Sequence, residues 1–201
     1  MKRKERIKQI AEQRRKEILD AAARIFARQG YRCTEVEQIA DALKIGKGTV
    51  YRYFPTKRKL FAAVVEQGMS RLAQAIISRL KDITNPLERI KTAIHAHFEF
   101  FEKNNDVVEM LIQERSEFKD QFRPVYHKYY HIQSVRTKQA IQKCIDQKLI
   151  KPLDPVGVSN LLTDLFYGTI FTYYLSGKKS SLKEKEKNIV EIFFNNILAN
   201  R

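Results

Sequence analysis

The segment formed by residues 34–57 constrains this chain most, because it contains two short helix patterns separated by a tight turn. Thr34 and Glu37 have the spacing of a capping box, in which each side chain bonds an amide at the start of a helix. This spacing predicts that a helix begins at Glu35. Four apolar residues then recur at the helical period and predict one buried face: Val36, Ile39, Ala40 and Leu43.

The helical pattern stops at residues 44–46, and a second short helix is predicted over residues 47–54. Val50 and Phe54 lie on the inner side of this helix. The outer side carries small, hydroxyl and basic groups: Gly48, Thr49, Tyr51 and Arg52. Two short helices joined by a tight turn, with a polar outer face on the second, are typical of the helix-turn-helix arrangement that enters the major groove of DNA.

Positive charge is concentrated in the same part of the chain. The formal net charge is +15, and residues 1–60 contain 17 Lys and Arg against seven Asp and Glu, compared with 21 against 16 in the other 141 residues. Clustered cations match the phosphates of a nucleic acid, whereas scattered cations do not. A basic surface can also serve solubility alone, so the charge indicates a DNA partner only together with the helix-turn-helix pattern.

The chain also resembles the TetR family of bacterial transcriptional regulators. The resemblance rests on Gly30-Tyr31, Thr34, Ile39-Ala40, Lys47-Gly48-Thr49, Tyr51-Arg52-Tyr53-Phe54, Thr56-Lys57 and Leu60-Phe61. These residues lie in the first third of the sequence, and the remainder is similar to the family only in being helical and variable. The resemblance implies a DNA-binding domain followed by an effector-binding and dimerising domain.

Two residues in the turn depart from the family pattern. Lys44 stands where the family usually has glycine, and Gly46 where it usually has a small hydroxyl or alanine. If Lys44 is left-handed, it costs about 1 kcal/mol relative to glycine. Gly46 provides no hydroxyl to cap the second helix.

The resemblance implies DNA contacts at seven positions: Thr34, Lys47, Gly48, Thr49, Tyr51, Tyr53 and Lys57. We expect Thr34 and the two lysines to hold phosphates, while Gly48 lets the backbone approach closely. Thr49 and Arg52 are the candidates for reading bases, since a threonine methyl suits thymine and an arginine either forks onto guanine or grips the backbone. The two tyrosines either contact phosphates or pack beside Phe54.

The rest of the chain shows only helical patterns, so an all-α fold of about nine helices is predicted. Asn85-Pro86 and Asp154-Pro155 each combine an N-cap residue with a proline suited to the first helical turn. Residues 1–13 are expected to form a partly ordered basic arm, with extra turns of the first helix as the alternative. Residues 1–60 are predicted to form the arm and the helix-turn-helix domain, and residues 61–201 the helical effector-binding and dimerisation domain. Helices are expected near residues 14–29, 35–43, 47–54, from 57 onward, 86–103, 106–116, 120–149, 155–176 and 182–200.

The last two predicted helices carry more apolar surface than one small domain needs. Gly168 in mid-helix costs about 1 kcal/mol relative to alanine, which is tolerable where another helix approaches closely. The family resemblance favours a four-helix interface with a second copy, and an ordinary core within one chain is the alternative. The residues predicted for this interface are Leu161, Leu165, Gly168, Ile189, Phe193 and Ile197.

Six polar or aromatic residues of the second domain are candidates for an effector pocket: His97, Tyr126, Tyr129, Gln133, Thr137 and Tyr167. Together they would suit a partly aromatic or long apolar ligand with one polar end. His97 is expected either as a hydrogen-bonded core histidine or as a polar group in the cavity. Ordinary buried polar residues that bond the backbone explain each of the six separately.

No sequence pattern indicates an enzyme, a metal site or a bound cofactor. His127 and His131 have a spacing that can hold zinc, but no carboxylate or cysteine lies at ligand spacing, so a solvated pair is favoured. Cys33 and Cys144 stand far apart and suggest no disulfide, and no segment is apolar enough to predict a membrane span. A cytoplasmic protein is expected.

These patterns together predict a sequence-specific DNA-binding transcriptional regulator. The predicted form is a homodimeric repressor that binds a palindromic operator in double-stranded DNA and is released by an unknown small-molecule effector. Two alternatives stay open: a nonspecific nucleic-acid binder, and a helical interaction scaffold with a vestigial DNA-reading helix pair.

Overall fold

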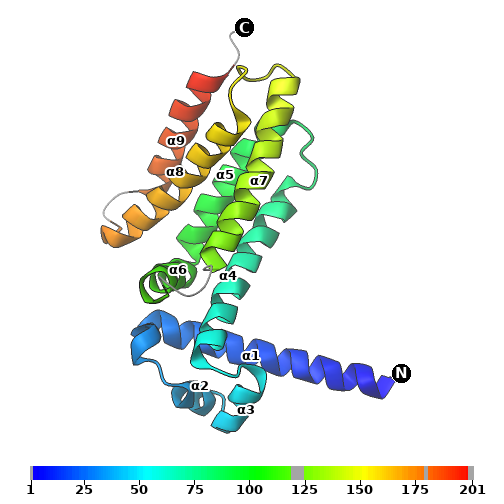
Figure 1. The fold of residues 1–201 in the computed structure, drawn as a ribbon, viewed down its shortest axis with the longest axis vertical. Coiled ribbons are helices and arrows are strands. Elements are labelled where there is room, and N and C mark those ends of the chain that lie inside the picture. Colours follow the sequence, from blue (N-terminus) through cyan, green and yellow to red (C-terminus); the bar gives the residue numbers. More distant parts are fainter. Residues whose placement is uncertain (1, 119–124, 179–180, 199–201) are drawn as a thin grey trace. The chain divides into compact units, whose positions relative to one another are not determined.

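The computed structural model describes residues 2–118, 125–178 and 181–198, and the regular elements in these residues are all α-helices (Figure 1). Nine helices lie in this part of the chain, so the predicted all-α fold is confirmed. They are α1 (Lys2–Cys33), α2 (Val36–Ala42), α3 (Lys47–Tyr53), α4 (Lys57–Leu80), α5 (Pro86–Lys103), α6 (Asn105–Glu117), α7 (Val125–Asp146), α8 (Pro155–Leu175) and α9 (Leu182–Ile197).

The two proline-containing helix starts lie where the sequence predicts them. The side chain of Asn85 accepts hydrogen bonds from the amides two and three residues further on, at 2.9 and 3.1 Å. Asp154 does the same at the start of α8, at 3.1 and 2.8 Å. Because proline occupies the first helical position in both, the amide that it lacks is one that would have no helical partner.

The N-terminal helix is longer than predicted. A partly ordered arm over residues 1–13 was expected, and this is wrong for the described residues, because α1 is helical from Lys2 onward. The segment contains no glycine or proline, and most of its residues are good helix formers. Turns added to an existing helix need no new nucleation. An exposed ion pair one turn apart, from Lys8 Nζ to Glu12 Oε1 at 3.8 Å, adds a small contribution.

The helices form two compact units. The first unit contains residues 1–69 and 109–125, and the second contains residues 70–108 and 126–201, so far as these residues are described. α4 belongs to both, since its first part lies in the first unit and its last part in the second. The predicted domains, residues 1–60 and 61–201, concern where DNA and ligand bind, and they stay a prediction.

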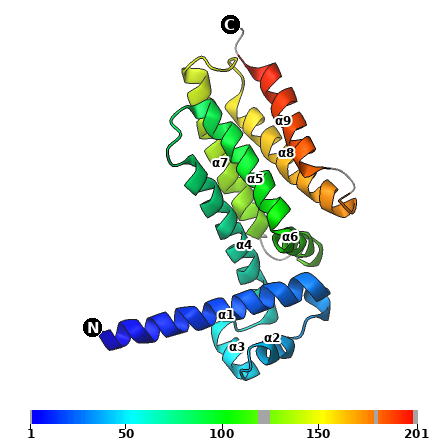
Figure 2. The same ribbon diagram turned by 180° about the vertical axis from the view of Figure 1, so that it is seen from behind.

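The first unit is built around α1, whose apolar residues recur at the helical period and turn inward. Ile18 and Phe26 are inaccessible to solvent, and Gly30 interrupts the regular helix with a φ of 82°. This left-handed angle suits glycine, and Gly30 comes directly after residue 29, where the first helix was predicted to end. α2 packs on α1, and α3 packs on α2 (Figures 1 and 2). Ile39 and Val50 are the fully buried residues at the centres of these two short helices.

The second unit is formed by long helices. α5 packs against α8 and α9, and α8 packs against α9. Figure 2 shows these three helices alongside α7. None of the helices in the described ranges is long and apolar enough to cross a membrane. The most deeply buried side chains of this unit include Ile94, Phe98, Phe101, Ile141, Leu162 and Phe166.

The long helix α7 ends earlier than predicted. It is helical over Val125–Asp146 rather than over 120–149, and residues 119–124 lie outside the described part of the chain. Lys148 takes a left-handed φ of 55°, and the amide that follows it donates to the carbonyl of Cys144 at 2.9 Å. This arrangement is a common helix ending, although glycine is the usual residue at the left-handed position.

Candidate nucleic-acid interface and ligand cavity

The start of α2 is capped one residue later than the sequence predicts. Glu35 is the N-cap, and its amide donates to Oε1 of Gln38 at 2.9 Å. The predicted capping pair, Thr34 and Glu37, is therefore wrong. Thr34 is 0% exposed, and its hydroxyl donates to the carbonyl of Gly30 at 2.7 Å. This buried hydrogen bond stabilises the turn before α2, and the hydroxyl is not accessible to solvent.

Lys57 connects the start of α4 to the same turn. Its Nζ donates to the carbonyls of Thr34 at 2.7 Å and Arg32 at 3.3 Å, and it lies 4.9 Å from the ring centroid of Tyr31. Two of the three ammonium protons therefore have partners within the protein. The side chain is 23% exposed, so Lys57 stabilises the fold before it makes any external contact.

The turn between α2 and α3 is held by main-chain hydrogen bonds. Lys44 is left-handed, with a φ of 53°, and the amide of Ile45 donates to the carbonyl of Ala40 at 3.0 Å. Gly46 is the N-cap of α3 and forms no side-chain hydrogen bond there. Both departures from the usual turn chemistry are therefore present in the folded chain.

α3 presents to solvent the face that the sequence pattern predicts. Val50 and Phe54 are 0% and 4% exposed and form the inner side. A Cβ added at Gly48 would meet no protein atom within 4 Å, so the space over α3 is open at this point. The exposed or half-exposed residues of this helix are Lys47, Gly48, Thr49, Tyr51, Arg52 and Tyr53. Their contacts with DNA stay a prediction.

Lys47 already has a partner in the protein. Its Nζ lies 2.9 Å from Oε2 of Glu37 on α2. The hydrogen bond to this carboxylate, together with its charge, raises the pKa of Lys47, so the ammonium form is maintained. A phosphate that binds Lys47 would have to replace or share this carboxylate.

The end of α1 is fixed by α6, which comes from a distant part of the sequence. The amide of Tyr31 donates to the side chain of Gln113 at 3.0 Å, and Arg32 pairs with Glu117 at 2.8 Å. The ring of Tyr31 also meets Phe118 edge to face, with centroids 4.9 Å apart. These contacts lie within the first unit and position the turn that precedes α2.

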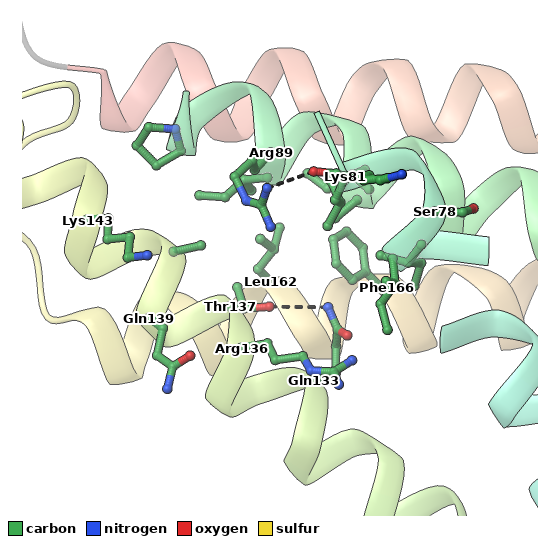
Figure 3. Close-up of a pocket in the computed structure, with 18 residues that line it drawn as sticks. Ser78, Lys81, Arg89, Gln133, Arg136, Thr137, Gln139, Lys143, Leu162 and Phe166 are labelled. Carbon is green, nitrogen blue, oxygen red and sulfur yellow. Dashed lines mark hydrogen bonds between the residues drawn. The ribbon is translucent and has the colours of Figure 1, made fainter. Parts of the chain in front are cut away.

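The second unit contains a cavity of about 520 Å³. It is lined by the last turns of α4 and by residues of α5, α7 and α8 (Figure 3). Ten of its eighteen lining residues are apolar, and the others are four cations and four neutral polar residues. A mostly apolar wall with a few polar groups is typical of sites for small molecules.

Two of the six predicted effector-pocket residues line this cavity. Gln133 and Thr137 both do so, with Gln133 Nε2 3.4 Å from Thr137 Oγ1 (Figure 3). Tyr126 and Tyr167 instead belong to a separate aromatic cluster in the same unit, with ring centroids 4.8 Å apart. Tyr129 is half-buried and does not line the cavity.

His97 adopts the first of its two predicted environments, a hydrogen-bonded core histidine. It is 2% exposed, and its Nδ1 donates to the carbonyl of Ala93 at 2.8 Å. The ring stacks on Phe166, with centroids 5.5 Å apart. Burial lowers the pKa of His97 to about 4, so the ring is neutral at pH 7. Since Ala93 and Phe166 line the cavity, His97 supports its wall from behind.

The residues predicted for a dimer interface fall into two groups. Leu161 and Leu165 on α8 are 55% and 37% exposed, and Gly168 on the same face has no protein atom within 4 Å of an added Cβ. Phe193 and Ile197 on α9 are only 8% and 7% exposed within the single chain. Ile189 is half-buried, and Ile192, which was not in the predicted set, is 65% exposed.

Comparison with known proteins places this arrangement in a family. Residues 18–64, which include α2 and α3, match the model of the bacterial regulatory proteins of the tetR family. The chain thus carries a helix-turn-helix segment of the TetR family. It is therefore similar to DNA-binding transcriptional regulators in the part that carries the helix-turn-helix.

Individual TetR-family relatives cover different shares of the chain. The transcriptional activator FasR of Mycolicibacterium smegmatis is 26% identical over 102 residues, which are 51% of this chain and 47% of FasR. The chain thus spans about half the length of that relative. The uncharacterised regulator YhgD of Bacillus subtilis is 27% identical over 80% of this chain and 84% of YhgD.

The similarity in fold extends over nearly the whole chain. A solved structure from Saccharomonospora viridis, described as a transcriptional regulator in complex with choline, superposes with a TM-score of 0.83. It covers 94% of this chain and 100% of the other, at 20% sequence identity. This comparison confirms the helical architecture beyond the helix-turn-helix.

Sequence reasoning missed two groups of residues in this chain. The first is the contact from α6 to the end of α1, made by Gln113 and Glu117. The second is the set of cavity cations. No local pattern marks either group, because the partners are separated by dozens of residues in the sequence and only the packing of the helices brings them together.

Proposed function

We propose that this TetR-family chain is a homodimeric repressor that binds a palindromic operator and is released when a small molecule enters the cavity of the second unit. The observation that carries the proposal is the exposed face of α3. Lys47, Thr49 and Arg52 are exposed or half-exposed, the space at Gly48 is open, and Val50 on the opposite side of the helix is buried. A helix with this arrangement fits the major groove. We also propose that the protein has no enzymatic activity and acts in the cytoplasm.

The proposed contacts divide into base reading and backbone binding. Thr49 and Arg52 would read bases, and Tyr51 and Tyr53 would donate their hydroxyls to phosphates. Lys47 and Lys57 would hold phosphates as point charges. The burial of Thr34 changes its proposed role, since its hydroxyl is bonded to the carbonyl of Gly30 and would position the start of α2 instead of contacting a phosphate.

A second copy is proposed to cover the exposed apolar face of α8 and α9. Leu161, Leu165 and Ile192 leave large apolar groups in water, and Gly168 offers room for close approach of a helix. A two-fold axis through this face would present two α3 helices to half-sites about one turn of B-DNA apart, or a multiple of it. Leu165→Glu should therefore produce a monomer in light scattering, whereas Val135→Glu on the exposed side of α7 should not. An unchanged dimer in the first variant would reject this face.

The cavity is the proposed site of the effector. The Saccharomonospora viridis protein has the same fold and binds choline, which supports the idea that the helical part of such a protein accommodates a small molecule. α4 contributes lining residues at its last turns and begins beside the helix-turn-helix pair. A ligand that binds one position of α4 better than another would shift the population towards the form with lower DNA affinity.

Sequence-specific binding is tested by titration. Fluorescence anisotropy should show tighter binding to the promoter duplex beside the chain's own gene than to a random duplex, at two salt concentrations. Arg52→Ala should reduce the difference between the two duplexes by about 1–3 kcal/mol and thereby relax specificity. Equal affinity of the unaltered protein for both duplexes would leave the nonspecific nucleic-acid binder as the better description.

Repression is tested separately from binding. A reporter gene placed behind the same promoter should be expressed less when the chain is present, and expression should recover when α3 carries Arg52→Ala. Lower expression without the chain would indicate an activator, as FasR is described to be. A scaffold with a vestigial helix pair would leave the reporter unchanged.

A further inference from the structure

The charge of the cavity in the second unit limits the ligands that it can take. The four charged side chains among its lining residues are all cations: Lys81, Arg89, Arg136 and Lys143. No aspartate or glutamate lies among the lining residues. None of the four cations forms an ion pair with a carboxylate in the described part of the chain. The cavity therefore offers positive charge that the protein itself leaves uncompensated.

Arg89 is the most firmly positioned of these cations. Its Nη1 donates to the carbonyl of Leu80 at 2.8 Å and to that of Ile83 at 2.7 Å, at the end of α4. These two bonds use both protons of Nη1 and leave the three N–H groups on Nη2 and Nε for another acceptor. Figure 3 shows the guanidinium reaching from α5 into the same space that Lys143 approaches from α7. A guanidinium held in this way is oriented before any ligand arrives.

The remainder of the cavity is apolar or neutral. Ile90, Ile94, Leu162 and Phe166 are at most 4% exposed and form a hydrocarbon wall. Gln133 and Thr137 provide neutral hydrogen-bonding groups. An apolar ligand body is stabilised by this wall in proportion to the area that it buries. A head group of negative charge gains charge-assisted hydrogen bonds, whereas a positive head group meets only like charge.

We propose that the cavity binds organic anions with a hydrocarbon body and a carboxylate or phosphate head. The head group contacts Arg89 and Lys143, and the body lies against the wall formed with Leu162 and Phe166. The inference rests on the proposed function only in naming this anion as the effector, because binding itself can be measured without DNA. The chemistry is opposite to that of a site for a quaternary ammonium ion such as choline.

The selectivity is tested by calorimetry on the full-length protein with four probes of equal chain length. These are octanoate, octyl phosphate, octanol and octyltrimethylammonium. Octanoate, octyl phosphate or both should bind at least roughly tenfold more tightly than octanol, because charge-assisted hydrogen bonds add to the apolar contact. The ammonium compound should bind more weakly than octanol. Equal binding of octanol and both anions, or preference for the ammonium compound, would overturn the proposal.

Two variants locate the binding site. Arg89→Gln should weaken binding of the preferred anion roughly tenfold or more and leave octanol binding nearly unchanged. Because Arg89 also bonds the end of α4, Lys143→Gln serves as a second variant on an exposed side chain. Lys143→Gln should weaken binding of the anion by about two- to fivefold. Lys138→Gln is the matched control, since Lys138 is exposed on the same helix and does not line the cavity. If Lys143→Gln and Lys138→Gln weaken anion binding equally, the loss comes from the change in net charge alone, and the proposed site is rejected.

The same probes separate this inference from the proposed function. Each octyl compound is added to the complex of the protein with its promoter duplex. Selective anion binding in calorimetry supports the inference whether or not the duplex is released. Release by the anion, lost in Arg89→Gln, further supports its role as effector, and release by octanol at the same occupancy would contradict the role of the charged head.

Discussion

The helix-turn-helix pair and the cavity differ in how their residues are distributed along the chain. The proposed DNA contacts lie within residues 34–57, most of them on the seven-residue helix α3. The cavity is lined by residues between 76 and 166, drawn from four helices and from the turn after α4. A surface formed by one helix face is readable from local periodicity, whereas a cavity exists only where separate helices meet.

The two regions also differ in how their cations are held. Lys47 and Lys57 have partners within the protein, a carboxylate at 2.9 Å and two carbonyls, so a phosphate adds to or replaces existing contacts. In the cavity, Arg89 is held by carbonyls, and Lys143 has no ion-pair partner in the described residues. Both lysines of the first region also lie near a carboxylate, at 2.9 Å for Lys47 and 4.0 Å for Lys57, whereas the cavity retains uncompensated charge.

The largest expected effect is on the buried core of the first unit. It tests whether the helix-turn-helix pair α2–α3, whose pattern is local in the sequence, still needs that core. Phe61 is 0% exposed, and its ring meets Phe26 and Tyr31 with centroids 5.1 Å away in both cases. Phe61→Ala should lower the free energy of unfolding by about 3–5 kcal/mol through lost burial and a cavity. Urea titration followed by circular dichroism measures this loss. Tyr51→Ala on the exposed face of α3 is the control and should change stability by less than about 0.5 kcal/mol.

A second effect concerns His97, which packs behind the wall of the cavity. The pKa of His97 is lowered from 6.5 to about 4 by burial, so between these pH values the unfolded chain binds a proton that the folded chain does not. The free energy of unfolding should therefore fall as the pH is lowered through this window, by about 3 kcal/mol at pH 4. Urea midpoints measured from pH 7 to pH 4 give this slope. His97→Leu should flatten it, while the exposed His127→Gln should leave it unchanged. An identical slope in both variants would assign the effect to other groups.

A third effect separates the structural role of Lys57 from its proposed contact with DNA. Lys57→Ala removes the hydrogen bonds to the carbonyls of Thr34 and Arg32 and should lower the free energy of unfolding by about 1.5–3 kcal/mol. Lys57→Ala should also weaken binding to all duplexes by the same factor, since a phosphate contact carries no sequence information. Thermal unfolding and anisotropy measure the two quantities. Lys59→Ala, on an exposed neighbour, should leave stability within about 0.5 kcal/mol. Unchanged stability in Lys57→Ala would contradict the view that the cations of the helix-turn-helix region are held by partners within the protein.

The smallest expected effect on the fold is at Gly48. An added Cβ meets no protein atom within 4 Å, and alanine favours a helix by up to about 1 kcal/mol over glycine. Gly48→Ala should thus leave thermal stability equal or slightly higher. Its affinity for the promoter duplex should nevertheless fall, because the methyl group occupies space that the DNA needs. Unchanged affinity would show that the DNA does not approach α3 closely at this residue.

Much of the fold followed from short sequence patterns. The starts of α5 and α8 were predicted from an N-cap residue and a proline, and both caps are present. The amphipathic pattern of α3 correctly placed Val50 and Phe54 inside. The extended α1 was given only as the alternative to a partly ordered arm, because a basic polar segment with only Ile7, Ile10 and Ala11 interleaved shows weakly where the helix begins. The capping pair at α2 was misplaced by one residue, since Thr34 and Glu35 both have suitable side chains.

The sequence by itself determined the number and order of the helices, the turn between α2 and α3 and the basic character of the first sixty residues, because these depend mainly on interactions within one or two turns. Only the tertiary structure decided that Thr34 is buried, that Phe193 and Ile197 belong to the interior while Leu161 and Leu165 remain exposed, and that Arg89 and Lys143 share one cavity. Each of these outcomes depends on which face of a helix meets which distant neighbour. Helical periodicity specifies that a face is apolar, but it does not specify the surface that covers it.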